Sequence, residues 1–124
     1  DGKGFELMKQ IGENITLDQK DNITIIGISN NLGYDTADEL RSAYQEVETD
    51  DVLVDLGQVS ITTSRGMATL LSIIVEGQEE ARQFCLCNVS EACMLIIDAM
   101  NIMEYVEGLE IVDSMEEGIA LFSS

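Results

Sequence analysis

The stretch over residues 52–71 constrains the fold more than any other part of the chain. The apolar run over residues 52–56 predicts a strand buried on both faces, and a helical pattern takes over after Ser64. Three hydroxyl side chains in a row, Thr62, Thr63 and Ser64, stand between the two. The first backbone N–H groups of a helix favour anions, so a phosphate at this junction would be stabilised.

The preceding and following strands can be recognised in the same way. Residues 15–18 alternate between apolar and polar side chains, residues 23–28 are more fully apolar, and Lys20, Asp21 and Asn22 provide turn chemistry between them. These two strands are therefore expected to form a hairpin. Residues 84–87 and 111–112 predict two later strands.

Helices are expected between these strands and after the last one. Thr36 with Glu39 fits a capping box, Ser90 is a candidate cap for a helix that continues through Met103, and Ser114 opens a final helix. The helix that follows the central strand is expected from Arg65 to about Arg82. Its inward stripe is predicted to be Met67, Leu70, Leu71 and Ile74, and its other side Thr69, Ser72, Ile73 and Glu76.

The resulting order, ββαβαβαβα, indicates a single α/β domain with a mixed, largely parallel sheet and helices packed against it. The 124 residues are enough for one domain with a substantial core. We place this domain at residues 13–124. Residues 1–12 are expected to be an N-terminal extension or the remnant of an upstream segment, with a short helical spacing of Phe5, Leu7, Met8 and Ile11.

Charge limits the kinds of partner. The chain has 24 acidic and 6 basic residues, a formal net charge of -18. Phosphate backbones and anionic lipids repel such a surface, so direct binding of nucleic acid and direct membrane insertion are not expected. A protein partner with a basic patch is the natural inference, and a role in solubility alone stays open as the alternative.

The composition also argues against an enzyme. The chain has no histidine, so the usual general base and the usual nitrogen ligand of zinc are missing. Neither GxGxxG nor GxxxxGK occurs, and Cys85 and Cys87 are expected to be core residues rather than metal ligands. We therefore expect no catalytic residues, no metal and no cofactor. The odd cysteine count and the absence of a long apolar run favour a cytoplasmic protein.

Four segments in this order resemble the STAS domain family, which includes bacterial anti-sigma factor antagonists and the cytoplasmic tails of sulfate transporters. They are residues 31–40 (NLGYDTADEL), 52–67, 87–90 (CNVS) and 111–117 (IVDSMEE). In the antagonist branch the second segment ends in a loop close to Asp-Ser-Ser-Gly, whose first serine is phosphorylated. Without gaps, Thr63, Ser64, Arg65 and Gly66 stand at these four positions, so two of the four depart from the pattern.

The resemblance implies a non-enzymatic switch that binds a serine kinase acting as anti-sigma factor and is regulated by phosphorylation of Ser64. Thr63 is the less favoured acceptor, and a PP2C-type phosphatase is implied as a second partner. From residues alone, a helix N-cap and nothing more is the favoured interpretation of Ser64, and the resemblance is what favours a regulatory hydroxyl. The alternative function is a regulatory subunit or tail of an ABC or sulfate-permease transporter, without phosphorylation. The expected partner surface comprises Asp35, Thr36, Thr63, Ser64, Arg65, Gly66, Ala68, Ser72, Ile73 and Glu76.

Overall fold

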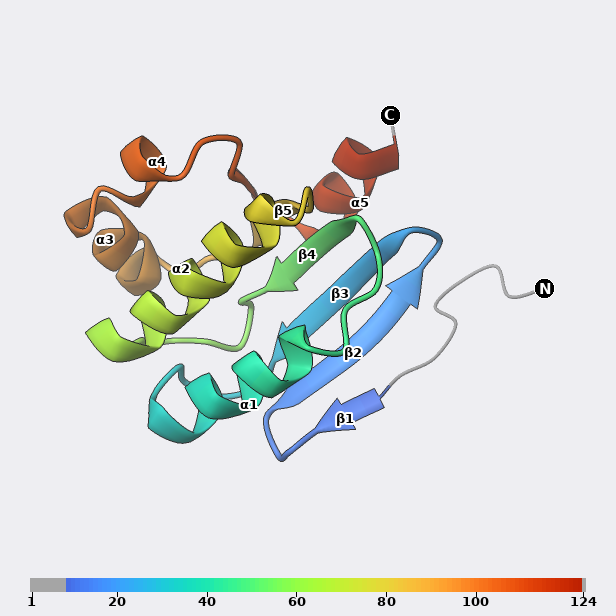
Figure 1. The fold of residues 1–124 in the computed structure, drawn as a ribbon. Helices are drawn as coiled ribbons and strands as arrows, with labels where there is room; N and C mark the ends of the chain where they lie inside the picture. The colour runs from blue at the N-terminus through green and yellow to red at the C-terminus, as the bar shows by residue number, and fades with distance from the viewer. Residues whose placement is uncertain (1–8, 124) are drawn as a thin grey trace.

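The computed structural model describes residues 9–123, in which helices cover both faces of a six-stranded sheet (Figure 1). The strands are β1 (Lys9–Ile11), β2 (Ile15–Lys20), β3 (Ile23–Ile28), β4 (Asp51–Asp55), β5 (Gln83–Cys87) and β6 (Glu110–Val112). The helices are α1 (Tyr34–Tyr44), α2 (Ser64–Glu79), α3 (Glu91–Ala99), α4 (Ile102–Tyr105) and α5 (Met115–Ser123).

The strands lie in the sheet in the order in which they occur in the chain. β1, β2 and β3 are antiparallel neighbours, and β3 to β6 are parallel. Asp21 and Asn22 close the hairpin between β2 and β3, and Asp21 adopts the left-handed conformation with φ of 55°. The predicted α/β fold with a mixed, largely parallel sheet is confirmed.

The two faces of the sheet carry cores of unequal size. α1, α2, α3 and α4 contribute to the larger core on one face, together with Val52, Val54 and Leu86 from the middle strands. α5 packs on the other face over a smaller cluster that includes Leu53 and Cys85. The central strand β4 supplies both clusters, because successive side chains of a strand point to opposite faces. This explains its unbroken apolar run.

Two elements were not expected from the sequence. Lys9–Ile11 forms the short edge strand β1 against β2, so Ile11 does not continue a helical spacing, while Phe5, Leu7 and Met8 lie outside the described residues. The helix expected to run from Ser90 through Met103 breaks at Asn101, which is left-handed with φ of 55°. α4 therefore follows as a separate turn of helix.

The start of α1 also differs from the expected capping box. The helix begins at Tyr34, so Thr36 lies inside its first turn and donates a hydrogen bond to the Asn31 carbonyl at 2.9 Å. The Glu39 carboxylate accepts two hydrogen bonds from Asn14, from its backbone N–H at 3.0 Å and its side-chain amide at 3.2 Å. Glu39 is thus engaged with the turn between β1 and β2. The two caps at Ser90 and Ser114 are confirmed.

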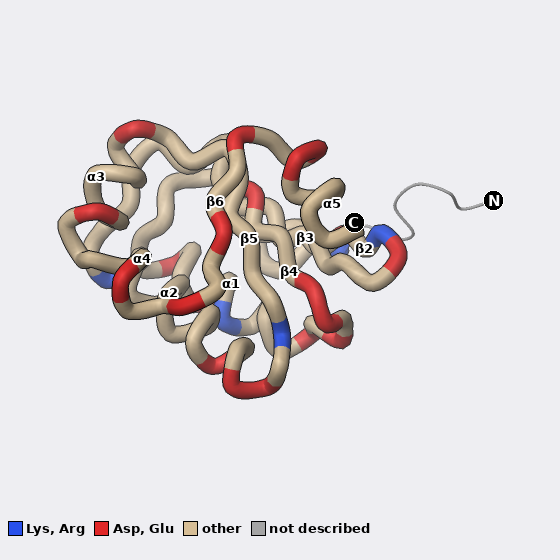
Figure 2. The backbone as a smooth tube through the Cα atoms, turned by 90° about the horizontal axis from the view of Figure 1, so that it is seen from above, with Lys and Arg blue, Asp and Glu red and all other residues tan. Residues whose placement is uncertain are grey.

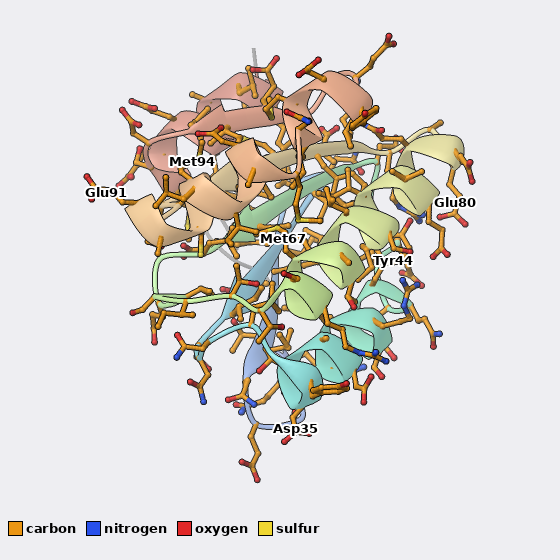
Figure 3. The ribbon with its side chains drawn as sticks, turned by 90° about the vertical axis from the view of Figure 1, so that its left-hand side faces the viewer. Asp35, Tyr44, Met67, Glu80, Glu91 and Met94 are labelled. Carbon is orange, nitrogen blue, oxygen red and sulfur yellow. The ribbon has the colours of Figure 1, made fainter. Side chains whose placement is uncertain are left out.

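The far end of α2 is held by Arg82, the residue before β5. Its guanidinium donates to the Thr49 carbonyl at 2.9 Å, the Val47 carbonyl at 3.0 Å and the Tyr44 hydroxyl at 3.1 Å. Glu80 accepts from both Arg82 and Tyr44. Figure 3 shows Tyr44 and Glu80 together at this end of the helical layer. These bonds join the ends of α1 and α2 to the segment that leads into β4.

Carboxylates are spread over nearly every element of the backbone, whereas lysine and arginine positions are few and scattered (Figure 2). Three of the cations in the described part of the chain are already paired: Lys9 with Glu46, Arg41 with Glu76 and Arg82 with Glu80. The surface formed by residues 9–123 is therefore acidic and has no large basic patch. Among the same residues, no helix is long and apolar enough to span a membrane.

Candidate partner-binding site at the start of helix α2

The loop before α2 is joined to the loop before α1 by backbone hydrogen bonds. Leu32 and Thr62 form an isolated parallel bridge, in which the Leu32 N–H donates to the Ile61 carbonyl at 3.1 Å and the Thr63 N–H donates to the Leu32 carbonyl at 3.0 Å. The Asn31 side-chain oxygen accepts two backbone N–H groups of the second loop, including that of Ile61 at 3.1 Å. The two loops therefore form one surface.

Ser64 is the first residue of α2 and its side chain is exposed. The cap belongs to Thr63, whose hydroxyl accepts a hydrogen bond from the Gly66 N–H at 2.9 Å. No hydrogen bond of the Ser64 hydroxyl is present within residues 9–123. The alternative that Ser64 serves as the N-cap is therefore wrong, because the neighbouring hydroxyl takes that place. The Ser64 oxygen is left open to solvent beside the positive end of the helix.

Gly66 and Thr36 shape this surface from below. Both are buried, so neither presents a side chain to a partner. A Cβ on Gly66 would lie 2.3 Å from the Leu32 carbonyl oxygen, which is backbone and cannot yield. Glycine therefore allows α2 to begin directly against the neighbouring loop. Thr36 fixes the same loop from the other side through its hydrogen bond to Asn31.

Arg65 links the starts of α1 and α2 by a different contact. Its guanidinium lies over the ring of Tyr34, 4.6 Å from the centroid, a cation–π geometry. Tyr34 remains 67% exposed and Ile61 59% exposed, which is high for such large side chains. Together with Thr63 and Asp35 they line a shallow pocket of about 380 Å³. Asp35 points away from the protein at the foot of α1 (Figure 3).

Tyr34 and Ile61 are exposed candidates for the partner surface that were not expected from the sequence. Neither has a helical or strand periodicity that marks it as exposed, because both lie where an irregular loop meets a helix start or a bridge. The available signal was their position: Tyr34 precedes the expected acidic residue Asp35, and Ile61 precedes the hydroxyl run. A large apolar residue beside a polar loop is a reason to consider a partner surface.

Further along α2, three of the expected partner residues are exposed: Ala68, Ser72 and Glu76. Arg41 of α1 donates to the Ser72 hydroxyl at 2.9 Å and approaches Glu76 at 3.5 Å. The expectation that Ile73 faces outward is wrong, since it is 1% exposed and belongs to the larger core. α2 packs between α1 and α3, so a wider arc of the helix is buried than one stripe (Figure 3).

The cysteines belong to the interior. Cys85, Cys87 and Cys93 are all buried and none is in a disulfide. Burial raises the pKa of the Cys85 thiol to about 11 and that of Cys87 to about 12, so both are neutral near pH 7 and are poor nucleophiles. Within the described part of the chain, no group of three histidine, cysteine or carboxylate side chains is arranged to hold a metal ion.

Comparison with known families provides the deciding observation. The model of the family described as "STAS domain" matches residues 14–118, which is most of the chain. The chain belongs to the STAS domain family. The four segments quoted from the sequence all overlap this match, so the resemblance inferred from them is confirmed. Comparison with curated protein sequences gives no significant match.

Solved structures of two kinds of protein are similar to the structure of this chain. An anti-sigma factor antagonist from Mycobacterium paratuberculosis has a TM-score of 0.76 at 15% identity, covering 95% of this chain and 100% of that one. A sulfate transporter family protein from Wolinella succinogenes has a TM-score of 0.73 at 16% identity, covering 83% and 86%. Unphosphorylated SpoIIAA, another anti-sigma factor antagonist, has a TM-score of 0.62 at 14% identity, covering 97% of each chain. At these identities the similarity establishes the fold.

Proposed function

We propose that this STAS domain is a non-enzymatic protein-interaction switch, in which a serine kinase that acts as anti-sigma factor binds the start of α2 and phosphorylates Ser64. The observation that carries the proposal is the open hydroxyl of Ser64. Thr63 caps the helix, so Ser64 can be modified without loss of the cap. The similarity to solved structures described as anti-sigma factor antagonists also supports this proposal.

Electrostatics describe how such a switch operates. A phosphate on Ser64 adds about 1.5 to 2 negative charges and three strong acceptors at the exposed first turn of α2. The helix start favours it by about 0.3 to 1 kcal/mol, so modification leaves the fold intact. The partner that had docked against the unmodified hydroxyl and the exposed Tyr34 and Ile61 then meets a charged group. A PP2C-type phosphatase would restore the binding form.

Phosphorylation by purified anti-sigma-type serine kinases with ATP tests the proposal. We expect one phosphate, placed on Ser64 by peptide mass spectrometry, and none in Ser64→Ala. Thr63→Ser keeps the capping oxygen while changing the neighbouring acceptor, so it serves as the matched control. Phosphate on Thr63 in the native chain, or on Ser90, would contradict the assignment to Ser64.

The second candidate is a regulatory subunit or tail of an ABC or sulfate-permease transporter, acting without phosphorylation. The similarity to the Wolinella sulfate transporter family protein favours it. SLC26A9 adds to this, with a TM-score of 0.73 at 13% identity over 94% of this chain and 23% of its own length. Cofractionation of the tagged chain with a permease in detergent-solubilised membranes, unchanged by Ser64→Ala, would favour this candidate over the switch.

A further inference from the structure

A groove of about 500 Å³ runs along the outer side of α2, from Ala68, one turn after Ser64, to Glu79 at the end of the helix. One wall is the exposed face of α2, which includes Ala68 and Ser72 of the expected partner surface, and the other is the end of α4. We call it the α2–α4 groove. The residues that matter for its chemistry are Leu71, Val75, Glu76, Glu79, Tyr105 and Val106.

The walls of the groove are apolar and accessible. Val75 is 42% exposed and Tyr105 is 79% exposed, while Val106 is buried beneath them. The wall on the α4 side is fixed from below, because the Gln78 side-chain amide donates to the Glu107 carbonyl at 2.7 Å. The groove is therefore preformed. Large apolar side chains exposed in a fixed hollow are typical of a surface that docks a partner.

Acidic residues occur on both sides of this apolar surface. Glu76 and Glu79 line it on the α2 side, and on the α4 side Glu104 and Glu107 lie one residue before and two residues after Tyr105 in the chain. Within residues 9–123, no lysine or arginine lines the groove. Arg41 pairs with Glu76 and donates to Ser72 at its edge, whereas Glu79, Glu104 and Glu107 take part in no ion pair among these residues. The net charge of -18 makes a second copy of this chain an unfavourable occupant. Charge complementarity selects a cationic one.

We propose that the α2–α4 groove binds an amphipathic helix of the partner protein, with apolar side chains against Val75 and Tyr105 and lysine or arginine against the carboxylates. This rests on the proposed function, because the groove would then be the second contact of the partner that reads Ser64. Laying an apolar helix face into a groove is a recurring mode of recognition. The acidic rim provides orientation and a faster approach.

The spacing along α2 separates the part of the groove around Val75 and Tyr105 from the switch at Ser64. Ser64 and Val75 are eleven residues apart in one helix, which corresponds to about 16 Å at 1.5 Å per residue. That is about twice the screening length at physiological ionic strength, roughly 8 Å. A phosphate on Ser64 therefore acts weakly on the part of the groove around Val75, whereas Ala68, at the near end of the groove, is one turn away from it. Phosphorylation would disrupt the contact at Ser64 and leave the contact at Val75 and Tyr105 in place, so that binding of the partner is weakened rather than lost.

The test uses the full chain and a peptide of leucine and lysine with helical amphipathic spacing, at physiological salt. A scrambled peptide of the same composition and a leucine–glutamate peptide are the controls. We expect amide chemical shift changes in the second half of α2 and around α4, and binding at least about tenfold tighter than that of either control. Equal binding of the scrambled peptide, or shifts confined to other elements, would overturn the proposal.

Matched variants locate the contact. Tyr105→Ala and Glu79→Lys are each expected to weaken peptide binding about tenfold. Leu95→Ala removes an apolar side chain that is 69% exposed but outside the groove, and Glu116→Lys reverses an exposed charge on α5 across the sheet. These two controls should bind the peptide within twofold of the native chain. Loss of binding in the controls, or full binding by both groove variants, would overturn the assignment.

Two further readouts separate this proposal from its alternatives. Ser64→Asp should bind the peptide within twofold of the native chain, which tests the groove. Phosphorylation of Ser64 by the kinase is measured separately and tests the proposed function. Either proposal can therefore fail while the other stands. Sedimentation of the free chain should show a monomer. A dimer that Tyr105→Ala dissociates would assign the groove to a second copy and overturn the proposal.

Discussion

The two ends of α2 are built in opposite ways. At its C-terminal end, Arg82 is largely buried and donates to two backbone carbonyls and two side chains. At its N-terminal end, Ser64 is exposed and its hydroxyl makes no hydrogen bond within residues 9–123. The hydrogen bonds of Arg82 anchor the C-terminal end of α2, and the anchored helix fixes the position of Ser64 at its N-terminal end. Substitutions at the first end should therefore change stability, and those at the second should change recognition.

Arg82→Met gives the largest expected effect on folding. The methionine retains the apolar stem but leaves the Val47 and Thr49 carbonyls without their donors. Loss of partners for buried groups costs about 1 to 3 kcal/mol each, so we expect the free energy of unfolding to fall by about 3 kcal/mol. Chemical denaturation measures it.

Arg41→Met is the matched control for Arg82, because Arg41 bonds Ser72 and Glu76 from a side chain that is 39% exposed. Exposed ion pairs contribute about 0 to 1 kcal/mol, so this variant should lose no more than about 1 kcal/mol. Equal losses in the two variants would mean that the end of α2 is not held more tightly than its middle.

Thr63→Ala gives the intermediate effect. Removing the hydroxyl leaves the Gly66 N–H without its capping acceptor, and the loss of an N-cap costs about 1 kcal/mol. Thr63→Ser keeps the oxygen and should fall within a few tenths of a kcal/mol of the native chain. Thermal unfolding of the three proteins side by side would show the difference. A stable Thr63→Ala would place the cap elsewhere.

Ser64→Ala gives the smallest effect on folding. The side chain is exposed, so we expect the free energy of unfolding to change by less than about 0.5 kcal/mol. Ser64→Asp should be slightly stabilising, by about 0.3 to 1 kcal/mol at low ionic strength, because it places a negative charge at a helix start. A loss above 1 kcal/mol in Ser64→Ala would show that the hydroxyl supports the fold after all.

The fold was predictable where side-chain periodicity and turn chemistry agree. The apolar run of β4, the turn at Asp21 and the cap at Ser90 each depend on a few neighbouring residues, and each is confirmed. The strand β1 was missed because three half-polar residues at a sheet edge carry little pattern. The break at Asn101 was missed because the apolar spacing continues across it.

The candidate site was less predictable, because its geometry depends on contacts between distant segments. Three adjacent hydroxyls allowed a shift of one residue in the cap, and the structure assigns it to Thr63 instead of Ser64. The burial of Ile73 follows from packing on both flanks of α2, which one apolar stripe does not reveal. The exposure of Tyr34 and Ile61 follows from the joined loops, thirty residues apart in the sequence.

The bridge between Leu32 and Thr62 also has a consequence for the dynamics of the site. The N–H groups of Leu32 and Thr63 each donate across it, so neither can exchange with solvent until the two loops separate. Their exchange with deuterium should then report a single opening event, with closely similar protection factors for the two amides. A bound partner that touches either loop would slow the exchange of both amides, because a single opening of the bridge exposes both.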